Sequence, residues 1–153
     1  MIKYIKKRKL KIDFGSGYHP KSGYKTCDIT FAPYLDYVYD RDTNTILGCK
    51  ENSVDEFYLK NVLHHADIKM VSECLFRYLK NEGIITVIEP LPEKYESNRC
   101  LDIYWYRYIY PRYEYSIPSY NRQDYVSVFL DVFEIVSHTS NEIYDIYTFK
   151  KRG

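Results

Sequence analysis

Short apolar runs separated by polar segments recur along the chain, and they predict strands. In the first two thirds of the sequence they occupy residues 10–14, 24–29, 35–39, 57–63 and 84–88, of which 35–39 is a short strand or else a connector. The last run is rich in β-branched side chains and alternates little, which is typical of a strand buried on both faces by helices. The pattern therefore predicts a sheet with helices packed on it.

One stretch has the three- and four-residue apolar spacing of an amphipathic helix, at residues 68–80. Asp67 stands where an N-cap is expected. We expect residues 81–83 to end this helix, with Gly83 in a left-handed or turn conformation.

The end of the chain repeats the order of helix and strand. A helix is predicted over about residues 122–131, with Ser119 as its cap, followed by strands at 133–137 and 143–149 joined by a polar turn at 139–141. Alternating strands and helices favour an α/β fold with right-handed crossovers. We predict a Rossmann-like, mainly parallel sheet with an antiparallel closing strand.

The connection between the first two strands is unusually short. It has nine residues, 15–23, and contains Pro20 and Gly23. Proline interrupts a helix, and a parallel crossover normally takes about ten to twelve residues or more. The first helix of the fold is therefore expected to be shortened or absent.

Composition limits the classes of protein to consider. The 153 residues (18.5 kDa) suit one domain, 1–153, and the net charge of +1 gives no general case for a nucleic-acid binder. Six basic residues lie within residues 1–11, and we interpret residues 1–8 as a solvated basic lead-in rather than a nucleic-acid or membrane contact. No apolar run approaches the roughly 18 residues of a membrane span. We expect a cytoplasmic protein, intracellular in a host if it is viral.

The four cysteines are far apart and have no histidine at ligand spacing. Free thiols in a reducing compartment are the simplest interpretation, and we expect no metal site.

A glycine motif follows the first predicted strand. Gly15-Ser16-Gly17 comes directly after residues 10–14, and Asp28 lies near the end of the next strand. Glycines let a backbone approach a ligand closely, and an acid at the tip of the neighbouring strand can accept hydrogen bonds from a ribose diol. This is the outline of a nucleotide-type cofactor site, and a plain β-turn is the alternative.

Further motifs occur in a fixed order. Residues 10–29 contain Gly15, Gly17 and Pro20, then Gly23-Tyr24, then Asp28-Ile29; residues 53–65 end in Val-Leu-His-His; and residues 78–90 end in a buried strand and proline. Over residues 9–90 the chain resembles the class I S-adenosylmethionine-dependent methyltransferases, and the short, type 11-like members most closely.

The resemblance implies S-adenosylmethionine as cofactor and assigns roles by position. Asp13 would contact the amino-acid end of the cofactor and Asn61 its methionine portion. The other implied contacts are backbone approach at Gly15, Ser16 and Gly17, the ribose at Asp28 with Ile29 beside it, and the adenine amino group at Asp40. For Asp40 a capped turn is an equal alternative.

His64 and His65 follow the fourth predicted strand and are candidates for catalysis. An imidazole titrates near neutral pH and can accept the proton of a hydroxyl acceptor. The alternative is an ordered histidine that caps the next helix or packs beneath it.

Residues 91–118 are rich in tyrosine and arginine and show no sustained period. We interpret them as an insert or lid that binds the acceptor, because aromatic rings stack on sugars and guanidinium groups hold anions. The same residues could instead pack a lid or form the surface of a homodimer. The candidate acceptor-binding residues are Tyr104, Trp105, Arg107, Arg112 and Tyr113.

The function predicted from the sequence is S-adenosylmethionine-dependent methyl transfer, as O-methylation of a sugar-containing or other small polar acceptor. One alternative is a nucleic-acid or RNA-cap methyltransferase, which would use the basic lead-in and stack bases on the insert. The other is a non-catalytic binding subunit that keeps the methyltransferase fold.

Overall fold

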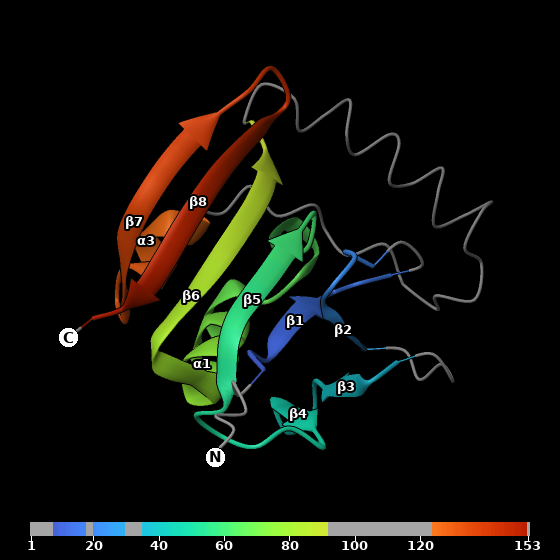
Figure 1. Ribbon diagram of the computed structural model, residues 1–153. Helices are drawn as coiled ribbons and strands as arrows, with labels where there is room; N and C mark the ends of the chain where they lie inside the picture. Colours follow the sequence, from blue (N-terminus) through green and yellow to red (C-terminus); the bar gives the residue numbers. More distant parts are fainter. Residues whose placement is uncertain (1–7, 18–19, 30–34, 92–123, 153) are drawn as a thin grey trace, which may run out of the picture.

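The computed structural model describes residues 8–17, 20–29, 35–91 and 124–152. These residues form one eight-stranded sheet in the order β4-β3-β2-β1-β5-β6-β8-β7 (Figure 1). The sheet is mixed, and all the strands of the described residues belong to it.

Five strands form its parallel centre. They are β1 (Lys11–Phe14), β2 (Lys25–Asp28), β3 (Tyr37–Asp40), β5 (Val54–Lys60) and β6 (Leu79–Pro90), each parallel to its neighbour. From β1 the strand order runs one way to β2 and β3 and the other way to β5 and β6. The boundary between β1 and β5 is therefore a topological switch point, where open parallel sheets bind ligands at the carboxyl ends of the strands.

Antiparallel strands close both edges. β4 (Thr45–Leu47) pairs with β3, β8 (Tyr144–Lys151) pairs with β6, and β7 (Phe133–Ser140) pairs with β8. The closing hairpin and the predicted fold class are confirmed. β4 was missed, because three residues are too few to show an alternating pattern.

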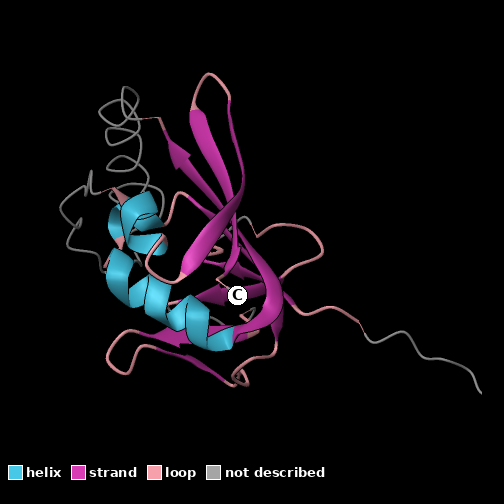
Figure 2. Cartoon of the chain, turned by 90° about the vertical axis from the view of Figure 1, so that its left-hand side faces the viewer, coloured by secondary structure: helices cyan, strands magenta, loops and turns pink. Residues whose placement is uncertain are grey.

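Both helices of the described chain pack on the same face of the sheet (Figure 2). α1 (Ile68–Tyr78) is capped by Asp67, whose Oδ1 accepts the N–H of Met70 at 3.1 Å, as predicted. α3 (Tyr125–Phe129) is short and begins after Asp124, which accepts the N–H of Ser127. The predicted second helix was therefore too long, and its proposed cap, Ser119, lies outside the described residues.

The core lies between these helices and the sheet. Alternate residues of the central strands are fully buried there, among them Phe57, Ile85 and Phe149. Along β6 the residues between them, Ile84, Thr86 and Ile88, are only half-buried. The expectation that residues 84–88 are buried on both faces is wrong, since α1 and α3 cover one face only.

The end of α1 also differs from the prediction. The helix stops at Tyr78 and Leu79 already belongs to β6, because Leu79 takes an extended conformation and pairs with Val54. Gly83 therefore lies within a strand. A Cβ there would lie 2.5 Å from Leu79 Cδ1 and 3.0 Å from the Asp55 carbonyl oxygen, so the glycine serves close packing rather than a turn.

Other boundaries shift by a few residues. β5 was expected at 57–63, but it starts at Val54 and ends at Lys60, where Asn61 takes a positive φ of 59°. A 3-10 turn, η1 (Leu63–His65), follows. The closing strands are longer than predicted, and the chain turns near Asn141, which accepts the N–H groups of Ile143 and Tyr144.

The short connection between β1 and β2 forms no helix in residues 15–17 and 20–24, in agreement with the prediction. It folds instead through turns at three glycines with positive φ, namely Gly15, Gly17 and Gly23. In the described chain, neither helix has the length and apolar character needed to cross a membrane.

Candidate cofactor site

The glycine loop after β1 folds over the end of β2. The N–H groups of Gly15 and Ser16 both donate to the Cys27 carbonyl oxygen, at 2.8 and 3.0 Å. The N–H of Gly17 donates to Asp28 Oδ2 at 2.7 Å. Three consecutive backbone donors are thus fixed by the tip of the neighbouring strand.

The two glycines meet different surroundings. Gly15 has φ +80°, and a Cβ there would lie 2.5 Å from Cγ2 of Val62, in the segment after β5. Gly17 has φ +55°, and a Cβ there would meet nothing within 4 Å. The loop therefore packs tightly against the segment after β5 and faces open space at Gly17, as a loop that approaches a ligand should.

Asp13 lies beneath this loop at the middle of β1. It is 4% exposed, and its Oδ2 accepts the N–H of Lys21 at 2.7 Å. Burial raises the pKa of this carboxyl, while the hydrogen bond from Lys21 opposes the rise. Asp13 thereby fastens the far end of the loop to the strand from which the loop departs.

Asp28 is buried at the tip of β2. Its Oδ1 accepts the N–H of Ile29 at 2.7 Å, and its Oδ2 accepts that of Gly17. Burial raises the pKa of Asp28, and the two backbone hydrogen bonds lower it by less. A carboxylate has about four acceptor positions, so these two hydrogen bonds leave capacity for the hydroxyls of a ligand.

Two buried polar atoms beside the loop have no hydrogen-bond partner in the described structure. They are Ser16 Oγ, after β1, and Asn61 Oδ1, after β5. Buried polar groups are nearly always hydrogen-bonded, and each exception needs an explanation. Both atoms lie after the two strands that flank the switch point, where a ligand would complete them.

Hydrogen bonds from the backbone N–H and the side-chain amide of Asn61 hold this residue in place. Its N–H donates to the Ile88 carbonyl oxygen at 3.0 Å, and its Nδ2 lies 3.4 Å from the Tyr144 hydroxyl. The amide is thereby turned so that Nδ2 faces β8, while Oδ1 stays buried and unpaired.

Asp40 ends β3 and forms a capped turn. Its Oδ1 accepts the N–H of Asp42 at 2.9 Å, and the chain then enters β4. The turn predicted as one alternative is therefore present. The adenine contact stays a prediction, since Asp40 is half-buried at the carboxyl end of β3 and has a second carboxylate oxygen.

His64 is buried and paired with Glu89, which was not among the predicted site residues. His64 Nδ1 lies 2.6 Å from Glu89 Oε2, and both side chains are at most 1% exposed. Glu89 Oε1 also accepts the N–H groups of Val62 and Leu63, at 3.1 and 2.7 Å. One carboxylate therefore caps η1 and orients the imidazole.

The second histidine, His65, belongs to η1, but its side chain lies outside the described residues. The burial of His64 and its pairing with Glu89 agree with the alternative of an ordered histidine.

Comparison with known proteins identifies the fold. The sequence matches no protein-family model and no curated protein. Solved structures do match it. A putative type 11 methyltransferase from Sulfolobus solfataricus superposes with a TM-score of 0.60 at 15% identity, over 96% of this chain and 86% of that one. A putative S-adenosylmethionine-dependent methyltransferase from Listeria monocytogenes gives 0.62 at 14% identity, over 95% and 92%.

The chain has the fold of the class I S-adenosylmethionine-dependent methyltransferases. The resemblance inferred from the sequence is thus confirmed at the level of fold. Human N-acetylserotonin methyltransferase, solved with S-adenosylmethionine, also matches, with a TM-score of 0.59 at 19% identity; the match covers 94% of this chain and 48% of the human one.

Within this methyltransferase fold, most of the predicted cofactor residues lie at one end of the sheet. The glycine loop, Asp28 and Ile29 are joined by hydrogen bonds, and Asn61 follows the next strand. Asp40 lies two strands from β1, at the tip of β3. The five predicted acceptor residues, Tyr104, Trp105, Arg107, Arg112 and Tyr113, all lie outside the described residues.

Glu89 and Val62 are the residues that sequence reasoning missed. Glu89 had a detectable signal, because it is the one charged residue in the apolar run Ile84 to Pro90 and stands at its end. An acid at the end of an apolar strand either reaches the edge of the sheet or is buried with a hydrogen-bonding partner. Val62 had no such signal, since its role depends on Gly15 lying against it.

Proposed function

We propose that this chain binds S-adenosylmethionine at the carboxyl ends of β1, β2 and β5 and transfers its methyl group to an acceptor. The observation that carries the proposal is the pair of unpartnered buried atoms, Ser16 Oγ and Asn61 Oδ1, beside a glycine loop that is already fixed by Asp28. A cofactor with an ammonium group, a carboxylate and a ribose supplies both donors and acceptors for such a site.

Each described residue has a separate task in this proposal. Asp28 would accept the ribose hydroxyls with the acceptor capacity that Gly17 and Ile29 leave. Asn61 Oδ1 would accept from the cofactor ammonium, and Ser16 Oγ would bond its carboxylate. Asp13 acts indirectly, by holding the loop through Lys21.

Bound S-adenosylmethionine supplies a methyl group on a sulfonium, which is open to in-line displacement. The protein holds the acceptor oxygen in line with that methyl group and removes the acceptor proton. In this displacement the acceptor oxygen would bond to the methyl carbon while the carbon–sulfur bond breaks and its electron pair returns to sulfur. His64 and His65 are our candidates for the proton, with Glu89 fixing the tautomer and ring orientation of His64.

For the acceptor we propose a sugar-containing or other small polar molecule, bound as an O-methyl acceptor by the aromatic residues of segment 91–118. A nucleic acid and a role as a non-catalytic binding subunit are the alternatives. Methyl transfer from a sulfonium needs positioning more than covalent chemistry, which is compatible with such an acceptor.

Calorimetric titration with S-adenosylmethionine and S-adenosylhomocysteine tests the cofactor. We expect one-to-one binding, weakened by about 1–3 kcal/mol in Asp28→Ala, the cost of a lost charged acceptor. Asp131→Ala is the matched control, because that exposed acid lies after α3, away from the loop. Wild-type protein that binds neither compound would refute the proposal, and unchanged affinity in folded Asp28→Ala would remove Asp28 from the site.

The histidines are tested by turnover once an acceptor is found by screening, beginning with sugars. Removing the proton acceptor should lower turnover roughly 100-fold or more while cofactor affinity stays. His64→Asn and His65→Asn separate the two positions, and thermal melting shows how much of any loss in His64→Asn comes from the broken pair with Glu89. Near-normal turnover in both folded variants would exclude a histidine base.

A further inference from the structure

The face of the sheet opposite α1 and α3 is the most unusual surface of the described chain. Parallel sheets normally carry helices on both faces. Here the helices lie on one face (Figure 2), and the strands β1, β5, β6 and β8 show their other face to the viewer in Figure 1. We call this the open face.

Strand register shows which side chains line the open face. One row runs across β1, β5, β6 and β8 through Lys11, Glu56, Ile84 and Lys150. The next row runs through Asp13, Tyr58, Thr86 and Thr148; Asp13 is buried and the other three are half-buried. The open face therefore has β-branched side chains on β6 and β8, and lysines, a tyrosine and the two carboxylates Asp13 and Glu56 around them.

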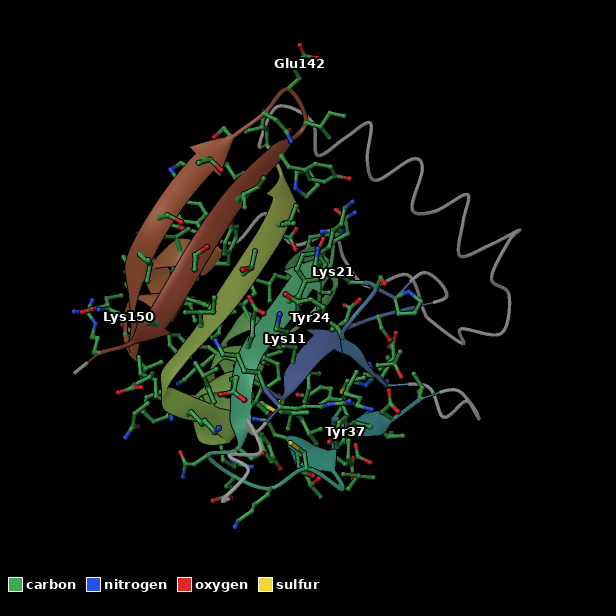
Figure 3. The ribbon with its side chains drawn as sticks, viewed as in Figure 1. Lys11, Lys21, Tyr24, Tyr37, Glu142 and Lys150 are labelled. Atoms are coloured by element: carbon green, nitrogen blue, oxygen red, sulfur yellow. The ribbon has the colours of Figure 1, made fainter. Side chains whose placement is uncertain are left out.

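A cluster of tyrosine and lysine stands at one end of this surface (Figure 3). The rings of Tyr24 and Tyr58 lie 5.7 Å apart, and Lys21 Nζ lies 4.6 Å from the Tyr58 centroid and 5.6 Å from that of Tyr24. Lys11 Nζ lies 5.5 Å from the Tyr24 ring. Glu56 adds a carboxylate to this cluster. Its Oε2 accepts a hydrogen bond from the Tyr24 hydroxyl at 2.8 Å and lies 3.7 Å from Lys11 Nζ.

A second such pair stands near the carboxyl end of β5. Lys60 Nζ lies 5.4 Å from the Tyr144 ring, whose hydroxyl contacts Asn61. Lys21 and Lys60 are exposed, and the described residues place no carboxylate within 4 Å of either. Neither ammonium group therefore forms an ion pair with these residues, although Lys21 also attracts the buried carboxylate of Asp13.

Charge along the sequence adds to this surface. The net charge of the chain is only +1, yet six basic residues precede or begin β1, and the last of them is Lys11 on the open face. Positive charge is thus concentrated along the sequence next to Lys11, which favours an anionic partner.

We propose that the open face binds single-stranded nucleic acid. Lys11, Lys21 and Lys60 would contact phosphates, and Tyr24, Tyr58 and Tyr144 would stack unpaired bases. Rings beside lysines on a flat sheet are the combination that single strands need, because each base has a face to stack and each linkage carries a charge. Duplexes keep their bases stacked inside, and an acidic peptide would leave the rings unused.

This inference does not depend on methyl transfer, because none of the atoms assigned to the cofactor is needed for it. Fluorescence anisotropy with labelled oligo-dT and oligo-U of about 12 nucleotides tests it, a length within the usual range of single-strand sites. Three phosphate contacts predict that log K falls with log salt with a slope of about −2, or about 20-fold between roughly 50 and 200 mM salt. DNA and RNA probes together show whether the 2′-hydroxyl matters.

Substitutions on the open face should weaken this binding in two ways. Tyr58→Ala should cost about 5- to 150-fold, the range for one stacked base. Lys21→Ala combined with Lys60→Ala should reduce the salt slope by about 1.4. Lys69→Ala is the matched control, because Lys69 is an exposed lysine on α1 and leaves affinity unchanged if the proposal holds.

Each contrary result has a definite meaning. Absence of binding at low salt overturns the proposal, as does an equal loss in Lys69→Ala, which indicates charge attraction without a site. Binding that is lost in Lys3→Ala/Lys6→Ala/Lys7→Ala but kept in the open-face variants assigns it to the basic lead-in. A dimer in light scattering that Tyr58→Ala dissociates makes the open face a subunit interface. Cofactor titration of the same variants reports on the methyltransferase site separately.

Discussion

Gly15 shows how a single residue joins two loops of this protein. Its φ is positive, and a Cβ added there would lie 2.5 Å from Val62 Cγ2, so both exclude a side chain, whereas Gly17 has only the positive φ. Gly15 is needed because the loop packs against Val62. Gly17 is needed only for its backbone conformation, and the space beside it is open.

Gly15→Ala should therefore destabilise the fold more than Gly17→Ala does. Both pay about 1–2 kcal/mol for a left-handed alanine, and Gly15→Ala adds about 1–3 kcal/mol for the clash. Urea unfolding measures the difference, and Val62→Ala in the Gly15→Ala background should recover part of it. Equal losses in the two single variants would contradict the contact with Val62.

Cofactor affinity should depend on pH through Asp28. Its pKa lies above the ordinary 3.8 because the carboxyl is buried, and only the ionised form accepts both ribose hydroxyls while it keeps its backbone bonds. Affinity should therefore fall as the pH decreases towards that raised pKa. Titrations between neutral and mildly acidic pH measure this. Asp28→Asn is the control, and its cofactor affinity should be low and independent of pH over this range.

The same raised pKa affects folding in the opposite sense. A carboxyl with a raised pKa in the folded state contributes stability below its unfolded pKa, and this contribution is lost as the pH rises through the folded pKa. Burial of Asp28 thus makes the folded protein less stable at neutral pH than a solvent-exposed carboxylate there would.

Among the elements, the junction of α1 and β6 is the place where helix and strand meet without a loop. Leu79 both ends the helix, by donating its N–H to the Leu75 carbonyl oxygen, and begins the strand, by pairing with Val54. Gly83 allows this because the chain passes close to Leu79 and Asp55 there.

Gly83→Ala should lower the free energy of unfolding by about 1–3 kcal/mol. Replacing glycine by alanine normally gains about 0.4–1 kcal/mol through the unfolded state, but contact with a backbone oxygen at 3.0 Å outweighs that gain. Chemical denaturation measures it, and the exposed neighbour Glu82→Ala should change stability by no more than about 0.5 kcal/mol. A stabilised Gly83→Ala would show that this junction is loose.

This junction also marks the limit of local reasoning. Apolar spacing and a cap predicted where α1 begins, because both signals belong to the helix itself. The end of α1 was mispredicted, since it depends on β5 pairing with Leu79 across more than twenty residues of sequence. Asn81, Glu82 and Gly83 read as a helix stop only while that partner is unknown.

At the scale of the whole molecule, the fold is a methyltransferase sheet with helices on one face in its described part. The α/β class, the closing hairpin and the missing first helix were all predictable, because strand and helix periods and Pro20 carry them. Burial of β6 on one face only was not predictable. Thr86 and its neighbours are β-branched on both faces of the strand, so the sequence does not indicate which face the helices cover.

The site divides in the same way. The glycine loop and Asp28 were predictable because their chemistry is local to residues 13–29. The pairing of Glu89 with His64 was not, because it joins the ends of two strands that become neighbours only in the folded sheet.

The carboxylate of Glu89 has a consequence for how the rim of the site opens. Because it accepts the amide protons of Val62 and Leu63, these two loop amides are bonded from β6 and not from their own turn. Their exchange with solvent deuterium should therefore require separation of β6 from β5, and should be as slow as that of the central strands. Since Val62 also rests against Gly15, the floor of the proposed cofactor site opens only when the middle of the sheet does.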